Sequence, residues 1–310
     1  MTGLPYIPNE IVVHLGAPGA AAENVYVPFP DYIKNVASSE IYPTWPESAL
    51  RANIYAQISF ALNRYYTEWY RSQGYDFDIT NSTRFDQSYV PGRDIYDSVG
   101  RIVDEIFESY LVKGNGIEPY FAQDCNGTTT TCPGLSQWGT VALAEQGLGA
   151  YDILTRYYGD DIRIVTNAPI RNGLPSYSGR PLRLGDTSIG VQLKQIQLNR
   201  ISTNYPGIPK IGATDGIFGV DTEEAVRAFQ RIFGLTQDGI IGPATWNRIS
   251  YIYNAVKRLS ELDSEGISQD EIADRFTAEI TPGSAGIEVL SIQYFLNVVA
   301  AFYDTVPRIA

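Results

Sequence analysis

The chain of 310 residues has a single histidine, two cysteines and no run of basic residues. His14 lies in the strand-like segment IVVHLG and no CxxC pair is present, so the sequence predicts neither a metal site nor a cofactor. A formal net charge of −12, spread along the chain, argues against nucleic acid as a partner. No stretch is apolar enough to cross a membrane, so no membrane partner is expected.

The N-terminal residues MTGLPYIPNE lack the basic and apolar regions of a secretory signal. We therefore expect either that the protein acts where it is made or that the chain is a fragment or processed form that has lost its leader. Two residue types leave further alternatives open. The 22 tyrosines suit stacking on sugar rings and equally suit packing in a core. Cys125 and Cys132 enclose the polar loop NGTTTT, which fits a local disulfide or two free thiols.

The first half of the chain mixes strand and helix patterns. Residues 10–16 and 24–29 have the composition of strands. From residue 46 to about 71, apolar side chains recur at steps of three to four, which predicts one long amphipathic helix. A second helix is predicted over residues 95–112, and a third through residues 141–147 and 150–158. Because strands and helices do not alternate as βαβ units, we predict an α+β domain over residues 1–165.

A linker and a small helical module follow. Residues 166–181 are rich in Pro, Gly, Asn and Ser, which is typical of a linker. In residues 182–255, the turn signal Asp215-Gly216 precedes a capping sequence at Asp221 and an apolar helical face. A second turn, Asp238-Gly239, leads to Pro243, which suits the first turn of another helix.

An internal repeat appears when the sequence is shifted by 98 residues, which pairs Gln195 with Gln293 and Pro209 with Pro307. The second copy stops at Ala310, before any counterpart of DGIFG. Residues 281–310 are therefore expected to be a partial repeat that was truncated from a longer parent or that packs against the first module. Residues 256–280, between the copies, are predicted to be a polar helical linker.

The motifs DGIFG, TEEAVRAFQ and GLTQDGIIGPAT occur in order within the module. With them, residues 182–249 resemble the peptidoglycan-binding domain of bacterial wall enzymes. The resemblance implies a small all-α three-helix domain that binds peptidoglycan. Most of the matched residues are turn glycines and apolar core residues, so few of them are expected to be ligands.

Three segments of the first domain carry a second resemblance: residues 35–60, residues 86–92, and residues 132–147 with 151–162. Their patterns VASSE, DQSYVPG, GLSQWG and ILTRYY, in this order, resemble the SpoIID/LytB-type domain of sporulation and cell-wall proteins. Together with the module they are similar to the spore cortex-lytic enzymes of clostridia. The resemblance implies an α+β catalytic domain of SpoIID type, located in the spore cortex or coat region or in the cell wall.

Enzymes of this family are lytic transglycosylases, which cut glycan between N-acetylmuramic acid and N-acetylglucosamine, and the acid implied by the VASSE segment is Glu40. A general acid protonates the glycosidic oxygen as an oxocarbenium-like centre develops. It then accepts a proton from the muramic acid C6 hydroxyl, which attacks C1 and closes a 1,6-anhydro ring. Because the internal hydroxyl replaces water, one carboxylate is sufficient.

Glu47, in contrast, has a local explanation, because Thr44 and Glu47 fit a capping box at a helix start. The resemblance also implies side chains that bind the sugar, some of which have structural alternatives. Arg51 could lie on a solvated helix face, and Ser136 and Gln137 could cap the following helix. The implied substrate-binding residues are Arg51, Asn53, Gln87, Tyr89, Ser136, Gln137 and Trp138.

The chain departs from the family pattern at Ser48 and Ile58, and no histidine accompanies Cys125, which argues against zinc. The expected partners are peptidoglycan glycan strands, with an activating protease or other cortex hydrolases as further candidates. The alternatives to an enzyme are a non-catalytic wall protein that binds peptidoglycan and enhances an amidase, and a spore structural protein.

Overall fold

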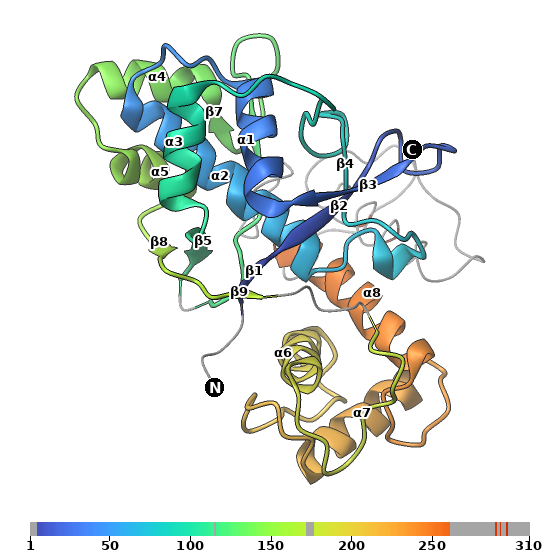
Figure 1. The fold of residues 1–310 in the computed structure, drawn as a ribbon. Helices are drawn as coiled ribbons and strands as arrows, with labels where there is room; N and C mark the ends of the chain where they lie inside the picture. Colours follow the sequence, from blue (N-terminus) through green and yellow to red (C-terminus); the bar gives the residue numbers. More distant parts are fainter. Residues whose placement is uncertain are drawn as a thin grey trace. The chain divides into compact units, whose positions relative to one another are not determined.

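The computed structural model describes residues 5–114, 116–171 and 177–260, with three single positions at 289, 292 and 296. The chain divides into two units, Met1–Asn254 and Ala255–Ala310. The partial repeat expected at 281–310 and most of the linker expected at 256–280 lie outside the described residues. The first unit has mixed α/β structure followed by a helical region (Figure 1).

Helix α2 (Glu47–Tyr66) forms the centre of the N-terminal part (Figure 1), and most of its side chains after the first turn are buried. Four other helices and strand β5 pack against it. The prediction of a long amphipathic helix is wrong in its end, because the helix stops at Tyr66 and not near residue 71. The helix is also more buried than an amphipathic pattern implies, since polar side chains such as Asn53 and Gln57 are buried too. The packing helices are α1 (Phe29–Glu40), α3 (Asp97–Ile106), α4 (Gln137–Glu145) and α5 (Ala150–Tyr158).

Short strands complete this part. The sheet β3-β2-β4 pairs β2 antiparallel to β3 and parallel to β4, and its apolar side chains, such as Ile11 and Val13, are buried. Pairs β1-β9 and β6-β7 are parallel, and β5-β8 is antiparallel. The strands are β1 (Ile7–Pro8), β2 (Glu10–His14), β3 (Asn24–Pro28), β4 (Ile79–Thr80), β5 (Tyr110–Lys113), β6 (Asp124–Cys125), β7 (Leu135–Ser136), β8 (Ile162–Val165) and β9 (Ile170–Arg171).

Two expectations about local structure are corrected here. The helix predicted over residues 95–112 ends at Ile106, because residues 110–113 instead pair with β8 and bury Leu111. The capping box predicted for Thr44 and Glu47 is absent, since α2 begins at Glu47 itself with Pro46 as N-cap and no side-chain cap. Strand β9 lies within the segment interpreted as a linker.

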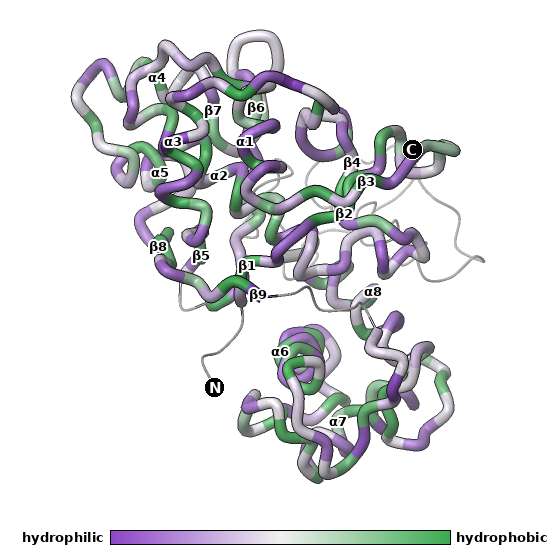
Figure 2. The backbone as a smooth tube through the Cα atoms, viewed as in Figure 1, coloured by the Kyte–Doolittle hydropathy of each residue, from purple (hydrophilic) through white to green (hydrophobic). Residues whose placement is uncertain are grey.

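The helical module contains α6 (Ile189–Asn204), α7 (Val220–Ile232) and α8 (Pro243–Ser260). Hydrophilic and hydrophobic stretches both occur along α6 and α7 (Figure 2), and the buried side chains include Val191 and Phe229. Asp221 is not the cap of α7, because the helix begins one residue earlier, at Val220. The Asp221 carboxylate instead accepts hydrogen bonds from the Gly212 and Thr222 amides.

A buried glutamine holds each Asp-Gly turn of the module. Gln195 of α6 accepts from the Gly216 amide at 2.9 Å and donates to the Ile217 carbonyl and the Thr222 hydroxyl. In the second turn, Gln230 of α7 makes the same set of contacts, to Gly239, Ile240 and Thr245. Gly216 and Gly239 both have positive φ, which a residue with a Cβ adopts only at a cost in energy.

A buried ion pair links the segment after α2 to the module within the first unit. The Lys194 ammonium donates to Glu68 at 3.3 Å, and the Trp246 indole donates to the same carboxylate at 3.2 Å. Lys194 has no exposed surface, and burial lowers its pKa to about 8 although the Glu68 charge opposes this change. Ser250 also donates to Glu68.

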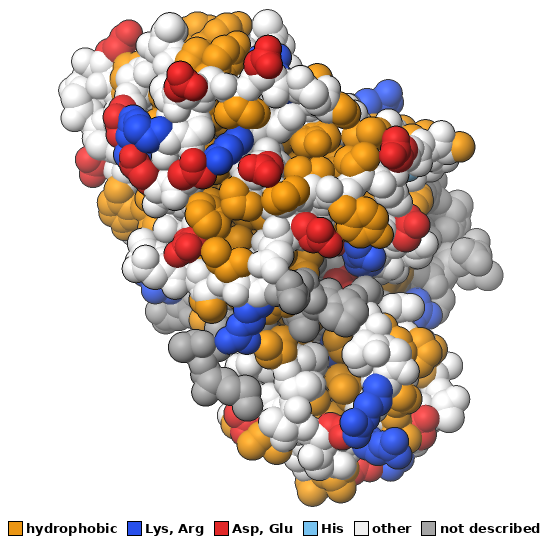
Figure 3. Space-filling model, in the orientation of Figure 1, with side chains coloured by type: hydrophobic (Ala, Val, Ile, Leu, Met, Phe, Trp, Pro, Cys, Tyr) orange, Lys and Arg blue, Asp and Glu red, His pale blue; other side chains and the backbone are white. Residues whose placement is uncertain are grey.

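Charged side chains elsewhere are interspersed. On the face drawn in Figure 3, basic side chains lie beside acidic ones, and ion pairs such as Arg101–Glu105 join exposed positions. None of the described helices combines the length with the apolar composition that a membrane span requires.

Replacing Glu68 with Gln tests the buried ion pair. We expect Glu68→Gln to lower the free energy of unfolding by about 3 kcal/mol, because it leaves a buried ammonium without its countercharge. Urea unfolding of the whole chain, followed by tryptophan fluorescence, measures the change. Glu223→Gln, which removes a more exposed pair with Arg227, is the control and should cost less than about 1 kcal/mol. Equal effects of the two substitutions would contradict the prediction.

Candidate active site

Glu40 is the last residue of α1, a helix that is anchored by buried side chains such as Ile33 and Val36. Its side chain is partly exposed and is held from two other segments. Gln57 of α2 donates to Oε2 at 2.9 Å, and the Ser88 amide, in the loop after β4, donates to Oε1 at 2.7 Å. Each carboxylate oxygen therefore has a donor that fixes its position.

Burial raises the pKa of Glu40 from 4.5 to about 7, although the hydrogen bonds from Ser88 and Gln57 oppose this change. A carboxyl group with a pKa near neutrality is present in both protonation states at neutral pH. Glu40 can therefore act as a proton donor and, once ionised, as a proton acceptor.

The first turn of α4 brings another predicted residue to Glu40. Gln137 lies with Nε2 at 3.4 Å from Oε2 of Glu40. Ser136 is the N-cap of α4 and accepts from the Gly139 amide at 3.0 Å, which is the structural alternative considered for it. Trp138 follows Gln137 and is 40 % exposed.

Gln87 and Tyr89, which were also predicted to bind substrate, both contact Tyr32 of α1. Gln87 is buried and links the Tyr32 hydroxyl to the Gln57 carbonyl, so it reaches Glu40 only through its neighbours. The Tyr89 ring stacks on Tyr32, with ring centroids 5.7 Å apart.

Arg51 and Asn53 are engaged in contacts that do not involve Glu40. Arg51 pairs with Glu47 at 2.7 Å and with Glu105, and hydrogen bonds from arginines lower the pKa of Glu47. Asn53 has no exposed surface through which to contact a sugar, and it donates to the Ala49 carbonyl and to Thr140. Glu47 is thus held by ion pairs and not by the predicted cap.

Sequence reasoning missed Asp124, which lies beside Glu40 in β6. Nε2 of Gln137 donates to Oδ1 of Asp124 at 3.1 Å. Burial raises the pKa of Asp124 well above its usual value, and the negative charge of Glu40 adds to this effect. The only sequence signal was an acidic residue directly before Cys125. Cys125 and Cys132 form a disulfide, which decides between the two alternatives for these residues.

Three aromatic side chains, Tyr42, Trp45 and Trp138, form a cluster that we call the aromatic wall. Their ring centroids lie 4.9 to 5.8 Å apart. Trp45 is buried, whereas Tyr42 is 57 % exposed and follows Glu40 by two residues. Exposed aromatic faces stack on the apolar face of a sugar ring. Along the chain, Tyr42 and Trp138 each lie within two residues of a member of the Glu40 site.

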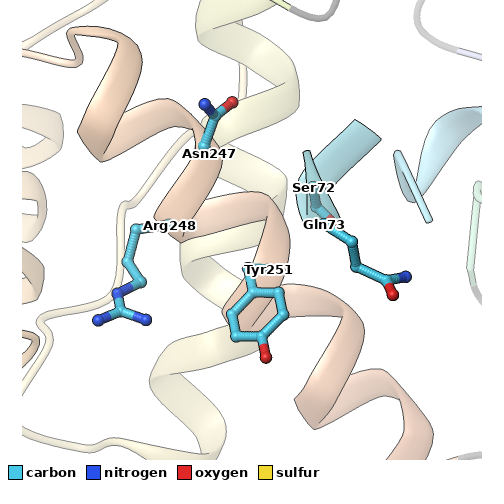
Figure 4. A pocket seen from close by; sticks show the side chains of 5 residues that line it. All are labelled: Ser72, Gln73, Asn247, Arg248 and Tyr251. Carbon is cyan, nitrogen blue, oxygen red and sulfur yellow. The ribbon is translucent and has the colours of Figure 1, made fainter. Parts of the chain in front are cut away.

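No group of three or more His, Cys, Asp or Glu residues placed to hold a metal occurs in the described part of the chain. Both ring nitrogens of His14 are in contact with protein groups, Nδ1 with Asn24 and Nε2 with the Ala17 carbonyl. A depression of about 510 Å³ lies away from Glu40, between η1 (Arg71–Gln73) and α8 (Figure 4). The five side chains that line it include no carboxylate: Ser72, Gln73, Asn247, Arg248 and Tyr251.

Comparison with known proteins identifies the helical module. Residues 188–249 match the family described as "Putative peptidoglycan binding domain". The chain contains a peptidoglycan-binding domain. That domain covers α6, α7 and the start of α8, and it indicates association with the cell wall.

Curated relatives share only parts of the chain. A zinc D-Ala-D-Ala carboxypeptidase of Streptomyces albus G is 42 % identical over 78 residues, which are 25 % of this chain and 29 % of that protein. An uncharacterised protein of Brachyspira hyodysenteriae is 33 % identical over 100 residues, 32 % of this chain and 26 % of its own. An uncharacterised protein of Kitasatospora aureofaciens is 51 % identical over 37 residues, 12 % of this chain and 31 % of its own. The chain thus spans less than a third of the length of each of these relatives.

Replacing Glu40 with Gln tests the raised pKa without any assay of activity. Between pH 4.5 and about 7 the native state binds more protons than the unfolded chain, so the contribution of Glu40 to stability falls as pH rises. Glu40→Gln removes this dependence. We expect the variant to gain stability relative to the wild type between pH 4.5 and pH 8, by on the order of 2 kcal/mol.

Thermal and urea unfolding of both proteins across this pH range give the measurement. Glu145→Gln, at an exposed position at the end of α4, is the matched control and should show no such gain. If the difference in unfolding free energy between Glu40→Gln and the wild type does not change with pH, the raised pKa of Glu40 is contradicted.

Proposed function

We propose that this protein is a peptidoglycan lytic transglycosylase in which Glu40 is both general acid and general base. The observation that carries the proposal is the Glu40 carboxyl group itself, which accepts hydrogen bonds from the Ser88 amide and Gln57 and has a pKa raised to about 7 by burial. The peptidoglycan-binding domain on the same chain supports the polymer as substrate.

The proposed reaction begins with Glu40 protonated. It donates its proton to the glycosidic oxygen between N-acetylmuramic acid and N-acetylglucosamine, and the C1–O bond breaks as positive charge develops on the sugar. The Ser88 amide and Gln57 then stabilise the carboxylate that remains. Glu40 next takes the proton of the C6 hydroxyl as that oxygen bonds to C1. The 1,6-anhydro product leaves Glu40 protonated again, so no net proton is consumed.

The aromatic wall and the binding domain have separate parts in this proposal. Tyr42 and Trp138 present exposed ring faces to a sugar next to the bond that is cut. The binding domain holds the chain on the polymer, which raises the concentration of glycan at the site. Spore cortex peptidoglycan is the form of substrate that the resemblance to cortex-lytic enzymes suggests.

A second candidate is a non-catalytic wall protein that binds peptidoglycan and enhances an amidase. The family match favours it, because binding alone accounts for that match. The similarity to the protein named as a zinc D-Ala-D-Ala carboxypeptidase covers only 25 % of this chain. It therefore suggests that the two proteins have a polymer in common and not a reaction.

Incubation of the protein with purified peptidoglycan, followed by mass spectrometry, tests the proposal. We expect 1,6-anhydro-muramic acid ends from the wild type and a loss of about 10²-fold or more in their rate with Glu40→Gln. Glu145→Gln should keep the wild-type rate. Anhydro products formed equally by Glu40→Gln, or release of D-alanine with the glycan intact, would overturn it. Intact glycan together with a faster added amidase would favour the second candidate.

Replacing Trp138 with Ala tests the aromatic wall. We expect Trp138→Ala to raise the KM for glycan fragments about fivefold to tenfold with a smaller change in kcat, because it removes one stacking surface. Tyr26→Ala, at an exposed tyrosine on β3, is the control and should leave KM unchanged. An unchanged KM in Trp138→Ala would exclude stacking at this position.

A further inference from the structure

The Glu40 site contains a second carboxyl group. Nε2 of Gln137 lies 3.1 Å from Oδ1 of Asp124 and 3.4 Å from Oε2 of Glu40, so one amide nitrogen is shared by two carboxyl groups. The two acids come from different elements, α1 and β6. Parallel pairing of Asp124 with Leu135 fixes β6 beside the strand that leads into Gln137.

No described lysine or arginine forms an ion pair with either carboxyl group. Arg93, on the chain after Ser88, donates to the Ser38 carbonyl on α1. Asp86, whose charge acts on Tyr32, is itself paired with Arg64 at 2.8 Å. Two negative charges at Glu40 and Asp124 would therefore have no described countercharge in direct contact, and such a pair favours a state that retains one proton.

Phenol groups also face the pair, but they do not titrate in the same range. Tyr32 on α1 lies near Glu40, and Tyr158 on α5 lies near Asp124. Burial raises the pKa of both phenols well above 10, so both remain neutral at neutral pH. Gln57 on α2 and Gln137 on α4 carry no titratable group. The proton of this site is therefore held by Glu40 and Asp124.

We propose that Asp124 is a positioning residue: Glu40 and Asp124, both held by the Gln137 amide, titrate as a pair that keeps one proton between them, and this retained proton is the one that Glu40 donates in the first step of the reaction. The catalytic part of this inference rests on the function proposed for Glu40. The sharing of the proton does not depend on that function. When Glu40 donates its proton to the glycosidic oxygen, the positive charge on the sugar is balanced by the carboxylate formed, and closure of the anhydro ring returns the proton.

Carboxyl ¹³C NMR titration of the whole chain tests the shared proton directly. Glu40→Gln and Asp124→Asn assign the two signals. We expect both signals in the wild type to follow two titration steps, because each group responds to ionisation of the other. In Asp124→Asn the Glu40 signal should follow a single titration step. The midpoint of that step should lie about one pH unit or more below the midpoint of the higher-pH step of the wild type.

Two further variants complete the NMR experiment. Asp124→Glu retains the charge and should restore two steps, whereas Asp160→Asn, at an exposed position, should leave the titration unchanged. Independent single-step titrations of Glu40 and Asp124 in the wild type would overturn the proposal, even if Asp124→Asn failed to fold. An unaltered Glu40 titration in folded Asp124→Asn would also overturn it.

The pH dependence of anhydro-product formation tests the catalytic part. Asp124→Asn should shift the alkaline limb of kcat to lower pH by about one unit, because Glu40 loses its proton more easily. If Glu40→Gln abolishes the products and Asp124→Asn leaves this limb unchanged, the inference fails while the proposed function stands. If Glu40→Gln retains activity, the proposed function fails. The NMR titration then still decides whether Glu40 and Asp124 keep one proton between them. Wild-type products with hydrolysed, reducing muramic acid ends that disappear in Asp124→Asn would show that Asp124 acts on water, and would overturn its role as a positioning residue.

Discussion

Burial of most of α2 is the constraint on which the N-terminal part depends. Polar side chains on such a helix find partners largely within the protein, because an unpaired buried polar group costs free energy. Ser59 accepts from the Leu111 amide at the start of β5, and Asn63 donates to the Pro119 carbonyl. Arg64 pairs with Asp86 in the loop that also carries Ser88. Each of these contacts fixes a segment that is distant in sequence, and the contact of Gln57 with Glu40 is one of the same kind.

The fold could be predicted where the local pattern and the tertiary environment agree. Strands β2 and β3 and helix α5 follow the predicted segments closely, since strand-forming composition or helical spacing there agrees with what packs around them. In α5 the helical spacing coincides with one buried face, whereas β2 is buried on both faces. The prediction failed for the end of α2, which stops at Tyr66 and not near residue 71, and Asn53, predicted to bind substrate, is buried against Thr140 of α4. It failed again at Tyr110–Lys113, because pairing with β8 overrides a helical pattern that continues from α3.

The candidate site was only partly accessible from the sequence. Glu40 and Gln137 came from motifs, whereas Gln57 and Tyr42 carry no local signal and Asp124 has only its position before Cys125. Their importance arises from contacts between segments that are far apart, such as Glu40 and Gln137, which are separated by 97 residues. Composition and periodicity depend on residues that are close together in the sequence. They therefore predict a helix or strand better than they predict the tertiary contacts of its side chains.

The glutamine contacts of the binding domain have a consequence for how that domain holds together. Gln195 on α6 binds the turn and the threonine at the start of α7, and Gln230 on α7 binds the turn and the threonine at the start of α8. Each helix therefore fixes the beginning of the next one, and the same unit, DGIxGxxT, is used twice. The domain is therefore a short linear array in which each helix is stabilised by contacts with the adjacent helix, as in repeat proteins.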